Sequence, residues 1–167
     1  MNAKQMFAGV GLYVLTGLLA AATSAGPARF EARTSGAESL TLRGSAEFGA
    51  VTDGVGSGRF VLTLGPASPT GTVVFTWPDG TRPEPGVYEL SDVDGADLRA
   101  LVVTGSPTAP RGAFRARAGT LSITRSSEDA IQGQFVLEAT GYTASDPGDE
   151  DRWLKVQGSF TARSGGR

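Results

Sequence analysis

The sequence predicts an all-β domain of about ten antiparallel strands, and three observations carry this prediction. Apolar and polar residues alternate over short segments, which is the pattern of strands with one buried and one solvated face. Turn-forming residues recur about every 8 to 12 positions. The 167-residue chain contains 24 glycines and 9 prolines, as expected of a protein with many turns. Uneven connections favour a β-sandwich or jelly roll; a closed antiparallel barrel is the alternative.

In the first half of the domain, five segments have strand character. Val73, Phe75 and Trp77 share one face of their segment, and Val74 adds an apolar residue to the other face. Both faces are therefore partly apolar, which is typical of a central strand. Residues 78–86 contain three prolines and are expected to form an extended connector. The five expected strands are 28–33, 40–48, 59–64, 72–77 and, at a sheet edge, 87–90.

The second half contains the clearest alternation, in a meander that runs from Gly112 to Tyr142. Its polar turn is expected at 126–129. Gly119 is interpreted as a tight corner between two strands. The inward-facing residues are expected to be Phe114, Ala116, Ala118, Leu121, Ile123, Phe135, Leu137 and Ala139. The expected strands are 98–104, 112–118, 120–124, 133–140 and 153–162.

Residues 1–25 differ from the rest of the chain. Lys4 precedes an uncharged run over 6–22, and small residues follow it up to Ala25. This pattern indicates a secretory signal peptide that is cleaved after Ala25. The alternative is a retained N-terminal membrane anchor, because the run is close to the minimum length for a transmembrane helix. Either interpretation predicts an exported, periplasmic all-β domain over 26–163, membrane-associated if 1–25 is retained, with a flexible tail at 164–167.

Composition argues against several classes of function. The chain has no histidine and no cysteine, so it lacks the usual general base, the usual thiol nucleophile and the usual metal ligands. Glu47, Glu89 and Glu138 could serve glycoside hydrolysis, but nothing in the sequence pairs them. A net charge of −2 argues against nucleic-acid binding. We therefore expect no enzyme, no cofactor and no nucleic-acid partner.

Two acidic segments are candidates for calcium binding. Asp92–Asp97 places carboxylates around a glycine, and Asp146–Asp151 holds four acidic residues. Neither has the full spacing of a calcium loop or its terminal bidentate glutamate. Solvated turns are the preferred interpretation of both, and no metal site is predicted.

Four residues form a candidate interaction surface: Arg115, Arg117, Arg125 and Trp153. Arg115 and Arg117 share the polar face of one expected strand, and Arg125 follows on the next. Such a stripe suits an acidic partner, phosphates or lipid headgroups; the alternative is cross-strand pairing with Glu138 and its neighbours. Trp153 begins the last strand opposite its inward set, where an exposed ring could contact a sugar or a protein.

Three segments carry a resemblance to known proteins: 82–90 (Arg-Pro-Glu-Pro-Gly-Val-Tyr-Glu-Leu), 118–124 (Ala-Gly-Thr-Leu-Ser-Ile-Thr) and 133–135 (Gly-Gln-Phe). They resemble a family of small exported bacterial all-β domains of unassigned function. The resemblance covers most of the chain after residue 25, and it implies fold and export without catalytic residues. The chain combines an anchor-like N-terminus with a small β-domain. In this overall design it is also similar to membrane-extrinsic accessory subunits, such as those of reaction-centre–light-harvesting complexes.

Two functional hypotheses follow. The first is a non-catalytic structural or interaction subunit that docks on a membrane protein complex at its periplasmic face. The second is a free exported binding module for a sugar, a lipid or a metal ion. They differ in one observable, because a docked subunit migrates with a large complex and a free module migrates alone.

Overall fold

The computed structural model describes residues 27–52, 58–93, 96–146, 148 and 151–165. Within these residues the domain is all-β, and no helix is present that could cross a bilayer. The expected signal peptide or anchor over 1–25 lies outside the described residues. The ten strands are β1 (Arg29–Gly36), β2 (Thr41–Gly44), β3 (Ala46–Thr52), β4 (Gly58–Leu64), β5 (Gly71–Trp77), β6 (Gly86–Ser91), β7 (Arg99–Ser106), β8 (Ala109–Ser126), β9 (Ala130–Thr143) and β10 (Arg152–Ser164).

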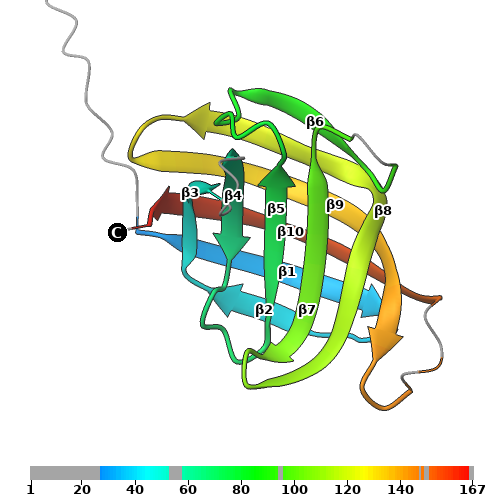
Figure 1. The fold of residues 1–167 in the computed structure, drawn as a ribbon. Helices are drawn as coiled ribbons and strands as arrows, with labels where there is room; N and C mark the ends of the chain where they lie inside the picture. The colour runs from blue at the N-terminus through cyan, green and yellow to red at the C-terminus, as the bar shows by residue number, and fades with distance from the viewer. Residues whose placement is uncertain (1–26, 53–57, 94–95, 147, 149–150, 166–167) are drawn as a thin grey trace, which may run out of the picture.

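The strands lie in two layers that cross at a large angle (Figure 1). β3, β4, β5 and β7 stand side by side in one layer, and β2, β1 and β10 run across them in the other. β8 and β9 are long and curve from the first layer into the second. Adjacent strands pair antiparallel except β10 and β3, which pair parallel through Arg163 with Glu47 and Ser164 with Phe48. This short contact joins the two layers along the edge opposite the curve of β8.

The core fills the space between the layers, and alternation decides which residues enter it. Phe60, Leu62 and Leu64 of β4 are buried, as are Val73, Phe75 and Trp77 of β5. Leu154, Val156, Phe160 and Ala162 of β10 enter from the other layer. Aromatic rings connect these sets: Phe135 of β9 meets Phe75 edge-on at 5.3 Å between ring centroids, and its centroid lies 6.5 Å from that of Phe160. Each large side chain buried in this way contributes about 1.5–3 kcal/mol to stability.

The sequence analysis makes two errors about the strands, although ten strands are both expected and found. The expected strand over 40–48 is two strands, because the chain passes between layers at Ser45: β2 pairs with β1, whereas β3 pairs with β4. Leu42, Ala46 and Phe48 nevertheless all face the core, as predicted. The two expected strands over 112–118 and 120–124 are the single strand β8. One error adds a strand and the other removes one.

Gly119 is a bend within β8 and not a corner between strands. Ala116 pairs with Ala139 and Ala118 pairs with Glu138, so Arg117 is the additional residue of a β-bulge. A one-residue shift reverses the faces of a strand. Phe114 and Ala116 are therefore buried before the bulge, and Leu121 and Ile123 after it. Ala118, predicted to face inward, is exposed for the same reason.

The bend requires glycine at position 119. Its φ of 139° is disfavoured for residues with a side chain. A Cβ atom there would also overlap the carbonyl oxygen of Val136 and lie 2.7 Å from the Cα of Leu137. β9 therefore passes closer to β8 at this point than any side chain would permit.

The connector over 78–86 is irregular, as expected, and a side-chain hydrogen bond from Tyr88 holds it in place. The Tyr88 hydroxyl donates to the Glu84 carbonyl oxygen at 2.7 Å, and its ring meets Trp77 edge-on at 6.1 Å. Burial raises the pKa of the Tyr88 phenol above its usual value.

β6 pairs only with β8 and is an edge strand, as predicted. β10 extends to Ser164, two residues beyond its expected end.

We predict that Gly119→Ala lowers the free energy of unfolding by roughly 2–4 kcal/mol, because it adds backbone strain and an overlap with β9. Gly49→Ala is the matched control: it also lies within a strand, and its Cβ atom would meet nothing within 4 Å. We expect Gly49→Ala to change stability by less than about 1 kcal/mol. Urea unfolding measures both values. Equal effects of the two substitutions would contradict the assigned bend.

Candidate functional site

The structure places Arg115 and Trp153 in one cross-strand row on the outer surface. Leu101 of β7 pairs with Arg115 of β8, Arg115 pairs with Thr140 of β9, and Thr140 pairs with Trp153 of β10. All four side chains face away from the core. Adjacent strands are about 4.8 Å apart, so Arg115 and Trp153 stand about 10 Å from each other. The row crosses the region where β8 and β9 curve between the layers.

Arg117 lies beside this row, because it follows Arg115 by two residues on the outward face of β8. Its Nε donates to the Thr140 hydroxyl oxygen at 2.7 Å, and its Nη1 donates to the Asp92 carboxylate at 2.6 Å. The hydrogen bond to Thr140 is a cross-strand contact with a neighbour of Glu138, whereas the carboxylate partner of Arg117 comes from the segment after β6. Glu138 lies opposite Ala118 and Lys155 instead. The Asp92 contact holds the end of β6 against the bulge.

Arg125 does not join this surface. It lies near the far end of β8, paired in register with Gln132, beyond the second register shift of the strand. The expected group of three arginines is thus a pair, Arg115 and Arg117, with Arg125 elsewhere.

Exposed apolar side chains surround this pair. Trp153 is 46% exposed, as its position opposite the inward set predicts, and Leu101 is 43% exposed. Tyr142, two residues after Thr140 on the outward face of β9, is 45% exposed. Trp77, by contrast, is buried against Phe60 and Tyr88. Sequence reasoning did not select Leu101 or Tyr142; only the register of four strands brings them beside Arg115.

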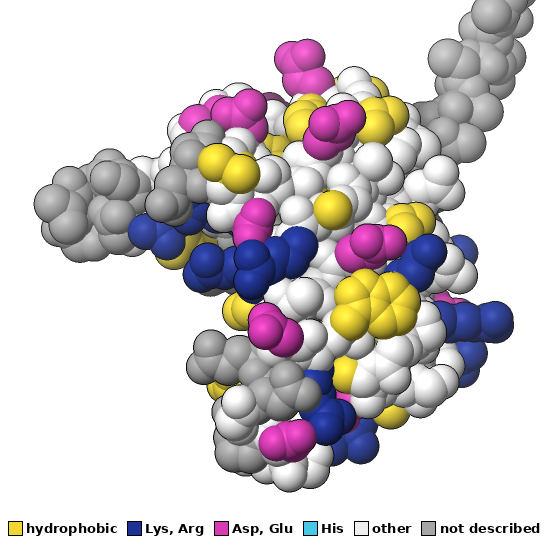
Figure 2. Space-filling view, turned by 90° about the vertical axis from the view of Figure 1, so that its right-hand side faces the viewer, with side chains coloured by type: hydrophobic (Ala, Val, Ile, Leu, Met, Phe, Trp, Pro, Cys, Tyr) yellow, Lys and Arg dark blue, Asp and Glu magenta, His cyan; other side chains and the backbone are white. Residues whose placement is uncertain are grey.

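We refer to Leu101, Arg115, Arg117, Tyr142 and Trp153 together as the arginine–tryptophan surface. Figure 2 views the molecule from the side on which β8 and β9 curve, and it shows Lys and Arg side chains gathered with apolar and acidic ones around them. Arginine, tryptophan and tyrosine are the residues that most often dominate binding energy at protein interfaces. The surface has the composition of a contact site.

One described carboxylate of each acidic segment forms an ion pair. Asp92 contacts Arg117, and Asp146 contacts Arg152 at 2.8 Å. Residues 94–95, 147 and 149–150 lie outside the described part of the chain. Among the residues that are described, no three Asp or Glu side chains come together in a group that could hold a metal ion.

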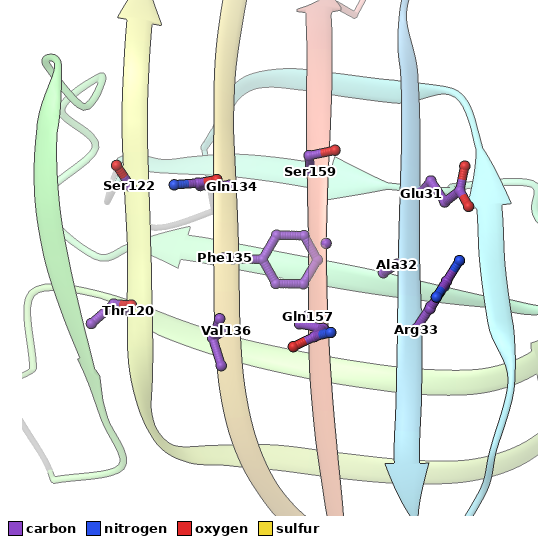
Figure 3. A pocket seen from close by; sticks show the side chains of 11 residues that line it. Glu31, Ala32, Arg33, Thr120, Ser122, Gln134, Phe135, Val136, Gln157 and Ser159 are labelled. Atoms are coloured by element: carbon purple, nitrogen blue, oxygen red, sulfur yellow. The ribbon is translucent and has the colours of Figure 1, made fainter.

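A second surface feature is a polar hollow of about 540 Å³ on the outer face of the other layer (Figure 3). Gly158 and Phe135 are cross-strand partners on the core-facing side of β10 and β9, and both line the hollow from below. Two cross-strand rows line it, one of Ser122, Gln134, Ser159 and Glu31 and the other of Thr120, Val136, Gln157 and Arg33. These hydroxyls and amides suit the hydroxyl groups of a sugar. The hollow lacks the aromatic platform that exposed sugar sites commonly use, and a polar outer face is ordinary for an antiparallel sheet.

Comparison with models of known protein families, with curated proteins and with solved structures finds nothing that matches this chain. The resemblance to small exported β-domains therefore stays an expectation from the sequence, and function has to be argued from surface geometry.

We predict that the two tryptophans differ in how much they contribute to the free energy of unfolding. Trp77→Ala should lower the free energy of unfolding by about 3–5 kcal/mol, because it empties part of the core. Trp153→Ala should lower it by about 1 kcal/mol or less, since nearly half of that side chain is already in solvent. Urea unfolding compares the two variants. A loss at Trp153 as large as that at Trp77 would mean that the exposed ring has a structural role.

Proposed function

We propose that this protein is a non-catalytic interaction subunit that docks, through the arginine–tryptophan surface, on a membrane protein complex at the periplasmic face of the membrane. The observation that carries the proposal is the cross-strand row that joins Leu101, Arg115 and Trp153. A rigid sheet holds these side chains in place before any partner arrives, so less conformational entropy is lost on binding.

The absence of histidine and cysteine from the sequence supports a role that depends on contact and not on chemistry. Periplasmic location rests on the character of residues 1–25, as a signal peptide or as an anchor. We also propose that the scaffold is a flattened two-layer sandwich. The bend of β8 and the two-pair contact of β10 with β3 support this description.

The direction of β1 supports an orientation for the docked protein. β1 begins at Arg29, close to the segment that would enter the membrane, and ends at Gly36, against which Trp153 packs. Seven strand steps of about 3.3 Å separate these residues, or about 23 Å. If residues 1–25 are retained as an anchor, the arginine–tryptophan surface lies at the end of the domain away from the lipid. A protruding partner then suits it better than a lipid headgroup.

The polar hollow supports the alternative of a free exported module that binds a sugar. Its hydroxyl and amide groups favour this alternative, but no exposed aromatic ring is among the described residues that line it.

We predict that the wild-type protein, expressed as the full chain and extracted from native membranes in mild detergent, migrates in size-exclusion chromatography with a large complex. Trp153→Ala and Arg115→Glu should shift it toward a free species near its own mass of 17.1 kDa, because they remove an aromatic anchor and reverse a charge at the interface. Arg33→Glu is the matched control, since Arg33 is an exposed strand arginine on the opposite layer. It should migrate like the wild type.

Two results would contradict the proposal. One is a wild-type protein that migrates alone. The other is a purified protein that turns over a glycan or an ester.

A further inference from the structure

The edge strand β6 leaves one side of its backbone without a partner among the described residues. β6 is the last strand in the order of the sheet, and it pairs with β8 from Gly86 to Ser91 without a break in register. Figure 1 shows it along the border of the sheet, beside β8. Within the part of the chain that the structure describes, no backbone hydrogen bond outside that pairing reaches 86–91. Every second residue of such a strand directs its N–H and C=O groups away from its neighbour, where another strand can bind them.

β6 lacks most of the features that prevent edge strands from pairing. Natural edges are commonly very short, or carry lysine, proline or a β-bulge. The other terminal strand, β2, has only four residues. β6 has six residues, an ordinary length for a paired strand, and it contains no lysine, no proline and no bulge. Its one charged residue is Glu89.

Contacts on the inner face hold β6 in place. Leu90 is buried in the core, and the Tyr88 ring meets Trp77 edge-on at 6.1 Å. The ion pair of Asp92 with Arg117 holds the residue that follows the strand. The free edge is therefore ordered before any segment binds to it, so less conformational entropy is lost on binding.

Two exposed side chains define the segment that complements this edge. Val87 and Glu89 stand two residues apart and share the outer face of β6. Val87 is 70% exposed, the largest fraction among the exposed large apolar side chains of the described residues. Glu89 forms no ion pair with any described residue. An added strand places one side chain opposite each of them, so an apolar residue opposite Val87 and a basic residue opposite Glu89 would complement both.

A second copy of this chain complements the edge less well. Residues that lie opposite each other in an antiparallel pair share a face. Two copies of β6 that pair about Tyr88 would place Val87 opposite Glu89, and pairing about Leu90 would place Ser91 there. Pairing about Glu89 itself would set two carboxylates against each other, which is unfavourable. None of these registers gives Glu89 a positive partner.

We propose that the free edge of β6 binds an extended segment of the partner protein as an added β-strand, with a basic residue opposite Glu89 and an apolar residue opposite Val87. The proposal rests on the docking function above, because it adds this contact to the arginine–tryptophan surface. The two sites are neighbours, since Ser91 at the end of β6 pairs with Ala118, which directly follows Arg117. A partner that covers the surface can therefore reach the edge with an adjoining segment.

The test uses dye-labelled peptides and protein purified from cells that express the full chain. The peptide Val-Thr-Lys-Thr-Val reads the same in both directions, so in either strand orientation it can set lysine opposite Glu89 and valine opposite Val87. Fluorescence anisotropy compares it with Val-Thr-Glu-Thr-Val. We expect the lysine peptide to bind the wild type at least about fivefold more tightly. Glu89→Lys should reverse that preference.

Methylation of the peptide backbone distinguishes strand addition from contact through side chains alone. One form of the lysine peptide carries N-methyl groups on both threonines, and the other carries one on the lysine. Alternate amides of a strand point to opposite edges. One methylated form should therefore bind at least about tenfold more weakly, because its hydrogen bonds to β6 are lost, and the other should bind nearly as the unmodified peptide does.

Valine variants test the position of the added strand. Val87→Lys should weaken binding of the lysine peptide at least about fivefold, because it removes the apolar contact and adds a like charge. Val51→Lys is the matched control, since Val51 is an exposed valine of β3. It should bind as the wild type does, and thermal melting of each variant excludes unfolding as the cause of lost binding.

Several results would overturn the proposal: equal binding of the lysine and glutamate peptides, equal effects of the two methylations, or a loss in Val51→Lys as large as that in Val87→Lys. A wild-type dimer in analytical ultracentrifugation that Val87→Lys makes monomeric would assign the edge to a second copy instead. The membrane experiment separates strand addition from docking. A complex that is lost in Trp153→Ala but kept in Val87→Lys would retain docking and overturn strand addition. Peptide binding without any membrane complex would retain the binding edge and overturn docking.

Discussion

The bulge at Arg117 is the constraint on which the rest of this domain depends. In β9 the alternation of inward and outward side chains runs without a shift, so that Ile131, Phe135, Leu137 and Ala139 all face the core. β8 pairs with β9 almost throughout, yet it must present Phe114 to the core in one layer and Leu121 in the other. One inserted residue reconciles the two, because it reverses the faces of β8 at the point where the strand bends. Gly119 then permits the close approach that the bend requires.

The same bulge shapes the outer surface. Arg117 is the inserted residue of the bulge, and its outward-facing side chain reaches Thr140 of β9 and Asp92. Its ion pair is largely exposed, and pairs of this kind contribute at most about 1 kcal/mol to stability. The role of Arg117 is therefore one of position: its contact with Asp92 connects the segment after β6 to the bulge of β8. The β-bulge at Arg117 is therefore part of both the bend of the sheet and the candidate site.

Alternation alone predicted much of the fold. It identified the inward faces of β4, β5 and β10, the edge position of β6 and the irregular connector before it, because each is a local consequence of side-chain polarity and turn chemistry. It could not distinguish a turn between two strands at Gly119 from a bulge at Arg117, since either one changes which alternate residues face the core. It also could not find the crossing at Ser45, where Leu42, Ala46 and Phe48 stay in phase although the strand changes partners.

The candidate site was predicted only in part, for a related reason. Exposure of Trp153 and Arg115 follows from local alternation. Their placement in one row depends on the register of β8, β9 and β10, which the pattern does not specify. The contact of Arg117 with Asp92 joins residues 25 positions apart and depends on where β6 ends. Residues that act together through register are found only once the sheet is known.

The continuity of β8 through Arg117 and Gly119 is tested most directly by nuclear Overhauser effects in the isotopically labelled protein. Our account predicts cross-strand contacts of Ala118 with Glu138 and of Arg115 with Thr140, on either side of the bulge. A hairpin with its corner at Gly119 would instead place Ala116 opposite Ser122. Observation of the Ala116–Ser122 contact, without those to β9, would contradict the bulge and with it the arginine–tryptophan surface.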